Sequence, residues 1–97
     1  MVKVIWRKSA LEQLNKAYEY IKKDSVQSAE KVRDVILNTA ERLKDNPEIY
    51  PLDRYRKNND ESIRAFECYS YRVAYQITPT EIRILRLRHT GREPLDY

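Results

Sequence analysis

The last part of the chain carries residue types that bind, or act on, a negatively charged group. Four arginines and no acidic residue lie between Arg83 and Arg92, and the only histidine, His89, is among them. Tyr97 ends the sequence. Guanidinium groups bind phosphates and carboxylates through paired hydrogen bonds, and histidine titrates near neutral pH. Three interpretations are open: a solvated basic edge, a surface for an acidic partner, or a site for a phosphodiester.

A second group of cations is predicted to share one face of a sheet. In "YRVAYQI" the side chain of Arg72 alternates with apolar neighbours, so it emerges on the face that a helix layer leaves uncovered, beside the small Ala74. We expect Arg64, Arg72 and one of the pair Arg86 and Arg88 to converge there, because facing side chains of neighbouring strands are about 5 Å apart. Charges this close repel one another, which predicts that an anion lies between them.

Length and composition limit the class of protein. The 97 residues suffice for one domain, residues 1–97, with a net charge of +4. One cysteine, Cys68, cannot form an internal disulfide, and no apolar segment follows the start, so we expect a cytoplasmic protein that contacts no membrane. One cysteine and one histidine are too few for zinc, and a single glycine excludes glycine-rich phosphate loops, so no metal or cofactor is expected.

The first half of the chain is predicted to form a strand and two helices. "VKVIW", residues 2–6, alternates as a strand does. Ser9 with Glu12 three residues later is a capping box and predicts the start of a helix, and Asp24 with Gln27 predicts a second start. Almost no residues separate the two helices, so they should form an antiparallel hairpin that serves as scaffold.

A long loop should follow the hairpin. Pro47 ends the second helix, and residues 47–61 show little periodicity. The loop contains the basic cluster Arg54, Arg56 and Lys57, with Tyr55 between the arginines. Loops of this length within compact domains are often functional, and aromatic residues among cations are typical of single-stranded nucleic-acid recognition.

Three strands complete the predicted fold, over residues 63–67, 71–77 and 81–88. In the last one, the phase of the alternation changes: Ile82 and Ile84 are predicted on one face and the two following leucines on the other, as in a strand inside a sheet. The expected fold is α+β, in the order β-α-α-β-β-β. A helix hairpin covers one face of a small, mostly antiparallel four-stranded sheet.

The order of these elements, with "YRVAYQI", "EIRILRLRH" and the tail "REPLDY", resembles the RelE/ParE superfamily of bacterial type II toxins over essentially the whole chain. The resemblance implies a toxin that a cognate antitoxin protein neutralises, in a complex that can be a hetero-oligomer. RelE-like members cut mRNA on the ribosome through the 2′-hydroxyl of the RNA. ParE-like members inhibit DNA gyrase and cut nothing themselves.

The resemblance also suggests roles for single residues. Arg72 matches the strand arginine that contacts the scissile phosphate, and Arg64 matches a basic residue of the preceding strand. Arg92 and Tyr97 approximate the arginine and tyrosine in the tail of the ribonucleases, although the spacing differs by one residue, and His89 lies where several relatives keep a histidine. RelE carries a second basic residue where this chain has phenylalanine, so loop cations would have to replace it.

These expectations lead to a toxin that favours ribosome-dependent mRNA cleavage without a metal. RNA cleavage of this kind needs a base, an acid and cations around the phosphorus. Arg72, His89, Arg92 and Tyr97 are the candidate catalytic residues. The candidate phosphate-binding residues are Arg54, Arg56, Lys57, Arg64, Arg86 and Arg88. A gyrase inhibitor without nuclease activity, connected with plasmid stabilisation, is the alternative. A small non-toxic module that binds RNA or an acidic peptide is the third.

Overall fold

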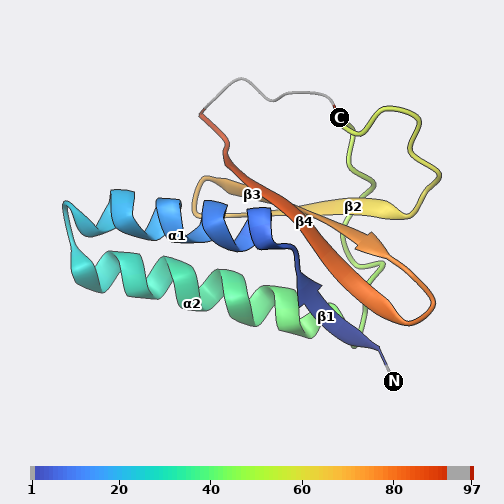
Figure 1. The fold of residues 1–97 in the computed structure, drawn as a ribbon, viewed down its shortest axis with the longest axis horizontal. Helices are drawn as coiled ribbons and strands as arrows, with labels where there is room; N and C mark the ends of the chain where they lie inside the picture. Colours follow the sequence, from blue (N-terminus) through green and yellow to red (C-terminus); the bar gives the residue numbers. More distant parts are fainter. Residues whose placement is uncertain (1, 92–96) are drawn as a thin grey trace.

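The computed structural model describes residues 2–91 and residue 97. Over these residues the chain forms, in order, β1 (Lys3–Trp6), α1 (Lys8–Lys22), α2 (Val26–Arg42), β2 (Ile63–Cys68), β3 (Tyr71–Ile77) and β4 (Glu81–His89). The predicted order of elements and the α+β class are confirmed, with two helices packed on a four-stranded sheet (Figure 1). No described helix is both long and apolar enough to cross a lipid bilayer.

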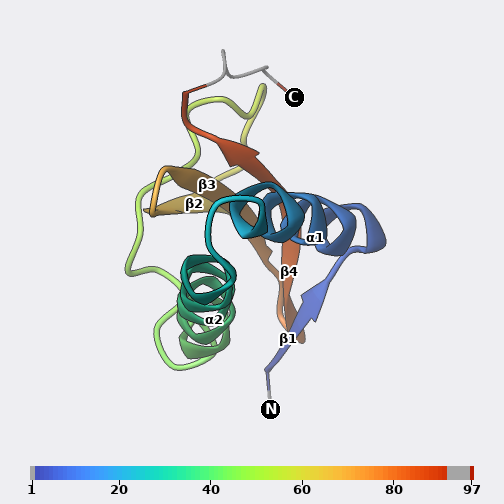
Figure 2. The ribbon, with the colours of Figure 1, turned by 90° about the vertical axis from the view of Figure 1, so that its left-hand side faces the viewer.

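The sheet is mixed, with strand order β1-β4-β3-β2. The first strand runs parallel to β4, whereas β2, β3 and β4 form an antiparallel meander. After β1 the chain forms the helix hairpin before it returns to the sheet as β2, and both helices lie against the same face of the sheet (Figure 2). We call the opposite side of the sheet the open face.

The core lies between the helices and the sheet. Helix α1 packs on β4, and α2 approaches β2. The side chains of Phe66, Val73, Tyr75, Ile82 and Ile84 are buried beneath the helices. The hydroxyl group of Tyr75 donates a hydrogen bond to a backbone oxygen of the loop that follows α2, which satisfies its one polar group inside the core.

Both helices begin at other residues than the capping signals predicted. The N-cap of α1 is Arg7, whose side chain makes no capping hydrogen bond. Its backbone amide donates to Ile84 and continues the ladder between β1 and β4, so the helix begins directly after the strand. The N-cap of α2 is Ser25, whose hydroxyl oxygen accepts from the amide of Ser28 at 3.1 Å. Asp24 belongs to the turn that closes α1, so the predicted caps Ser9 and Asp24 were wrong.

A β-bulge explains the change of phase in the last strand. Ala74 faces Arg86 while the next residue, Tyr75, faces Ile84, so Leu85 is an extra residue in β4. Leu87 therefore shares the helix-covered face with Ile84, and the predicted common face of Leu85 and Leu87 was wrong. The prediction that β4 lies inside the sheet is confirmed.

The loop between α2 and β2 contains no helix or strand, as predicted. It first runs along the outer edge of β2, where Leu52 forms an isolated bridge with Arg64 and the amide of Asp53 donates to Ile63 at 2.9 Å. It then brings Asp53 to the open face. The side chain of Asn59 donates to the backbone oxygen of Ile63 at 2.8 Å, which fixes the return of the loop toward β2.

Candidate target-binding face

The register of the sheet places three arginines side by side on the open face, and a fourth, Arg83, lies on the same face further along β4. Arg72 in β3 faces Glu67 in β2 and Arg88 in β4, and Ala74 faces Arg86. The sequence predicted that Arg72 lies beside one of the pair Arg86 and Arg88, and the register places both of them next to it. Because Ala74 is small, a cavity of about 240 Å³ remains among these side chains.

Arg64 does not belong to this group, and the prediction that it converges with Arg72 was wrong. The register pairs Arg64 with Tyr75, a residue of the helix-covered face. Side chains alternate between the two faces along a strand, so pairing with Tyr75 puts the side chain of Arg64 on the opposite face from that of Arg72. The guanidinium group of Arg64 donates from Nη1 to the backbone oxygen of Tyr50 at 2.6 Å and to that of Glu48 at 3.3 Å. Its contacts are therefore with the loop after α2.

Arg72 forms two ion pairs within the chain. Its Nη2 lies 2.9 Å from Oδ1 of Asp53, and its Nη1 lies 2.9 Å from Oε2 of Glu67. The centre of the guanidinium group also lies 4.9 Å from the ring centroid of Tyr55. Burial disfavours the charge of Arg72, but the hydrogen bonds and charges of Asp53 and Glu67 outweigh burial and raise its pKa. The anion expected beside this arginine is supplied by the protein itself.

Asp53 is the buried centre of this arrangement, with 2% of its surface exposed. Oδ1 accepts hydrogen bonds from Arg72 and from the backbone amide of Tyr55 at 3.1 Å, and Oδ2 accepts one from the hydroxyl group of Tyr97. Burial alone would raise the pKa of Asp53, but these hydrogen bonds and the charge of Arg72 lower it. Asp53 is therefore a carboxylate at neutral pH.

Tyr97 is held beside the loop through both its backbone and its side chain. Its amide donates to the backbone oxygen of Tyr55 at 2.9 Å, and its own backbone oxygen accepts from the amide of Lys57 at 2.5 Å. The centres of the Arg86 and Arg56 guanidinium groups lie 3.7 Å and 5.1 Å from its ring centroid. Figure 1 shows the end of the chain next to this loop.

The environment of Tyr97 opposes a role as a base. Burial, the hydrogen bond to Asp53 and the negative charge of Asp53 raise the pKa of Tyr97 above its ordinary value. The charges of Arg86 and Arg56 act in the opposite direction and are outweighed. A role as a base would need a lowered pKa, so this environment does not suit Tyr97 for it.

His89 faces Tyr71 on the helix-covered side of the sheet, at the end of β4. The two rings meet edge to face, with centroids 5.2 Å apart. Nδ1 of His89 accepts a hydrogen bond from the amide of Gly91 at 2.9 Å, so a neutral ring carries its proton on Nε2. An added Cβ at position 91 would lie 2.8 Å from Cε1 of His89, so a larger residue there would displace the imidazole ring.

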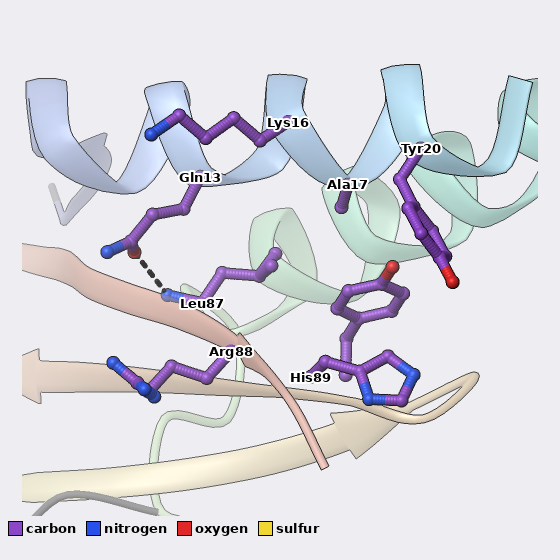
Figure 3. Close-up of a pocket in the computed structure, with 8 residues that line it drawn as sticks. Gln13, Lys16, Ala17, Tyr20, Leu87, Arg88 and His89 are labelled. Carbon is purple, nitrogen blue, oxygen red and sulfur yellow. Dashed lines mark hydrogen bonds between the residues drawn. The ribbon is translucent and has the colours of Figure 1, made fainter. Parts of the chain in front are cut away.

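A second cavity of about 360 Å³ lies between α1 and the end of β4, and His89 borders it together with Lys16 and Tyr20 (Figure 3). The side chain of Gln13 crosses this space, and its Oε1 accepts from the amide of Leu87 at 2.8 Å. His89 also touches the rim of the open-face cavity. His89 therefore lies at the end of β4, where it borders a cavity on each face of the sheet.

The predicted cations of the loop are exposed. Arg54 lies with its guanidinium centre 5.0 Å from the ring centroid of Tyr55 and donates to its hydroxyl group at 2.9 Å. Arg56 and Lys57 flank the position where Tyr97 binds the loop. Arg92, the remaining predicted residue, lies outside the described residues.

The comparison with known proteins decides the family. A model described as "ParE toxin of type II toxin-antitoxin system, parDE" matches residues 4–94. The chain belongs to the ParE toxin family. It is thus a toxin of a type II toxin–antitoxin system within the RelE/ParE superfamily, as the sequence resemblance implied. No curated protein matches it in sequence.

Two solved structures share the fold of this ParE family member. A chain of the chromosomal ParDE toxin–antitoxin system from P. aeruginosa aligns with a TM-score of 0.72 and 18% identity, over 92% of this chain and 96% of the other. A chain of the YoeB dimer from Staphylococcus aureus aligns with a TM-score of 0.60 and 14% identity, over 91% and 95% of the two chains. At these identities the likeness concerns the fold.

Sequence reasoning missed the two acidic residues that bind Arg72 on the open face of this ParE family member, Asp53 and Glu67. Glu67 was detectable in principle, because a hairpin closed at Tyr69 and Ser70 pairs Glu67 with Arg72 directly. Asp53 lies 19 positions before Arg72, in a loop without periodicity, and only the folded loop brings its carboxylate to that arginine.

Proposed function

We propose that this ParE family toxin acts by binding its target, DNA gyrase, and that it cuts no RNA itself. Gyrase inhibition is the activity that the resemblance described above assigns to ParE-like members. We further propose that a cognate antitoxin protein neutralises the toxin, since the similar chain from P. aeruginosa belongs to a ParDE system.

The observation that carries this proposal is the engagement of Arg72. Cleavage through the 2′-hydroxyl of RNA requires a cation that is free to stabilise the charge growing on the phosphate. Both Nη atoms of Arg72 are bound to carboxylates of the chain, Asp53 and Glu67. A phosphate that approached this arginine would meet two negative charges, which supports a face that does not process RNA.

The two candidate proton carriers support the same conclusion. The hydroxyl group of Tyr97 donates to Asp53, and its raised pKa keeps it protonated at neutral pH. His89 uses Nδ1 to accept from Gly91, which leaves Nε2 of the neutral ring as a donor. Neither side chain is placed to accept a proton from a hydroxyl group held beside Arg72.

Binding to a large partner suits the loop between α2 and β2. Its exposed cations Arg54, Arg56 and Lys57 follow the buried Asp53, and hydrogen bonds from Arg56 to Asp53 and between Lys57 and Tyr97 fix the backbone. A basic surface on an ordered loop loses little entropy on binding and attracts a negatively charged partner over a distance. We assign target recognition to this loop and to Arg88.

The test compares gyrase inhibition with mRNA cleavage. Purified toxin should inhibit supercoiling of relaxed plasmid by gyrase, and induction in cells should arrest growth without translation-dependent cuts in mRNA. The matched variant is Tyr97→Phe, which keeps the ring beside Arg86 but removes the hydroxyl group that a nuclease would use. It should remain toxic. Mapped mRNA cuts that disappear in Tyr97→Phe would refute the proposal.

Ribosome-dependent mRNA cleavage is the second candidate, because His89 borders the same cavity as Arg72 and Arg88. This candidate predicts that His89→Ala abolishes both growth arrest and mRNA cuts, while gyrase supercoiling is unaffected by the wild-type toxin. Growth arrest that persists in His89→Ala with DNA damage signalling would exclude it.

A further inference from the structure

The open face contains a site with the donors of an anion-binding site, and the chain fills it with its own carboxylate. Three donors of different kinds converge on Asp53: the guanidinium group of Arg72, the backbone amide of Tyr55 and the hydroxyl group of Tyr97. Phosphate oxygens are bound in proteins by the same kinds of donor. Asp53 therefore occupies the position that a phosphate oxygen would take between these groups.

The charges around Asp53 extend beyond Arg72. Burial, together with the charges of Arg88 and Arg72, lowers the pKa of Arg86, while Tyr97 and the carboxylate of Asp53 act in the opposite direction. Three arginines from two neighbouring strands thus line the same cavity as one buried carboxylate. Without that carboxylate, their mutual repulsion would favour binding of an anion from solution.

We propose that Asp53 is a specificity-determining residue that excludes nucleic-acid phosphates from the open face. This proposal rests on the proposed function, since a toxin that binds gyrase through an arginine-rich face has to avoid the abundant RNA of the cell. The carboxylate neutralises the inner arginines, and the exposed cations of the loop stay available for the target.

The tether of Asp53 gives it the advantage over a phosphate from solution. Its amide donates to Ile63 at 2.9 Å, and Asn59 donates to its carbonyl oxygen at 3.4 Å, so the backbone holds the carboxylate next to Arg72. A tethered group competes at an effective concentration on the order of millimolar or higher. An RNA phosphate would have to displace Asp53 from the loop or bind next to its negative charge.

The experiment measures binding of a fluorescently labelled single-stranded RNA of about ten nucleotides, a length that spans a small domain. Asp53→Asn keeps the shape of the side chain and removes its charge. We expect Asp53→Asn to bind this RNA about tenfold more tightly than wild type, with a steeper dependence on salt because more phosphates are contacted. Glu67→Gln removes the other carboxylate that pairs with Arg72. Glu67 is far more exposed than Asp53, so this variant should give a smaller gain.

Two variants separate the proposed role from a general gain of positive charge. Asp45→Asn makes the same chemical change at an exposed position in the turn after α2 and should leave RNA binding near the wild-type value. The double variant Asp53→Asn with Arg72→Gln should lose the gain of the single variant. Thermal melting of each variant shows whether it is folded, and Glu67→Gln provides the test if Asp53→Asn is not.

The proposal is overturned if folded Asp53→Asn binds the RNA no more tightly than wild type and Asp45→Asn do. If Asp53→Asn is not folded, the absence of any gain in Glu67→Gln overturns it. It is also overturned if the gain persists when Arg72 is replaced. Either result leaves the gyrase assay of the wild-type toxin unaffected, so failure here differs from failure of the proposed function. Wild-type mRNA cleavage would instead contradict the proposed function.

Discussion

Replacement of Arg72 by glutamine tests whether Asp53 depends on this arginine as its main counter-ion. The substitution leaves a carboxylate that is 2% exposed without its cation. Breaking a buried ion pair from one side typically costs about 3–5 kcal/mol. The cost at pH 7 is limited by protonation of Asp53, which for an ordinary carboxyl group requires about 4 kcal/mol. Asp53 also keeps the amide of Tyr55 and the hydroxyl group of Tyr97 as donors.

We therefore expect Arg72→Gln to lower the free energy of unfolding by about 2–3 kcal/mol at pH 7, which corresponds to a fall in the melting temperature of about 10–15 °C for a domain of this size. Urea denaturation followed by circular dichroism measures it. Arg88→Gln is the matched control, because it removes an arginine from the same face for which no ion pair is found among the described residues. The double variant with Asp53→Asn should recover most of the loss, since no buried charge then remains.

The dependence on pH follows from the pKa of Asp53, which the folded protein lowers. A carboxylate with a lowered pKa contributes stability above its unfolded pKa, and this contribution is lost as the pH falls through the folded value. In Arg72→Gln, the pKa of Asp53 should rise, so the difference from wild type should shrink as the pH falls from the raised pKa in the variant to the lowered pKa in wild type. A loss no greater than that of Arg88→Gln, or one that is independent of pH, would refute the assignment of Asp53 and Arg72 as a coupled pair.

Three further substitutions test other parts of the fold. Arg64→Met keeps the apolar stem but removes the hydrogen bond to Tyr50, so it should lower the free energy of unfolding by about 1–2 kcal/mol. Gyrase inhibition per folded molecule should stay unchanged. A loss of inhibition without a loss of stability would place Arg64 at the target. Ser70 has φ 68° in the turn between β2 and β3, a left-handed conformation that glycine adopts more readily than serine. Ser70→Gly should therefore raise the free energy of unfolding, measured by urea denaturation, by about 0.5–1 kcal/mol. The absence of a gain would contradict backbone strain at this position. Gly91→Ala should displace the ring of His89 from the backbone amide of residue 91, seen as a shift of the histidine signals in NMR spectra, with unaltered signals as the contrary result.

The sequence by itself determined the order and type of the elements. The capping patterns predicted two helices, although the N-caps lie at other residues, and Pro47 predicted an end of the second helix just before it, whereas α2 already ends at Arg42. Alternation predicted β3 with its correct ends. These signals are local, because each depends on residues within a few positions of one another, and a single sequence is enough to read them.

Only the tertiary structure decided which charged residues meet. The register of β2 against β3 put Arg64 on the covered face and Glu67 beside Arg72, and the bulge at Leu85 returned Leu87 to the core. The position of Asp53 depends on the path of a loop whose geometry no periodic pattern encodes. The predicted anion between the arginines exists, but it comes from the chain. Neutralisation of these half-buried arginines by the chain itself is favoured because a tethered carboxylate loses less entropy than a ligand from solution.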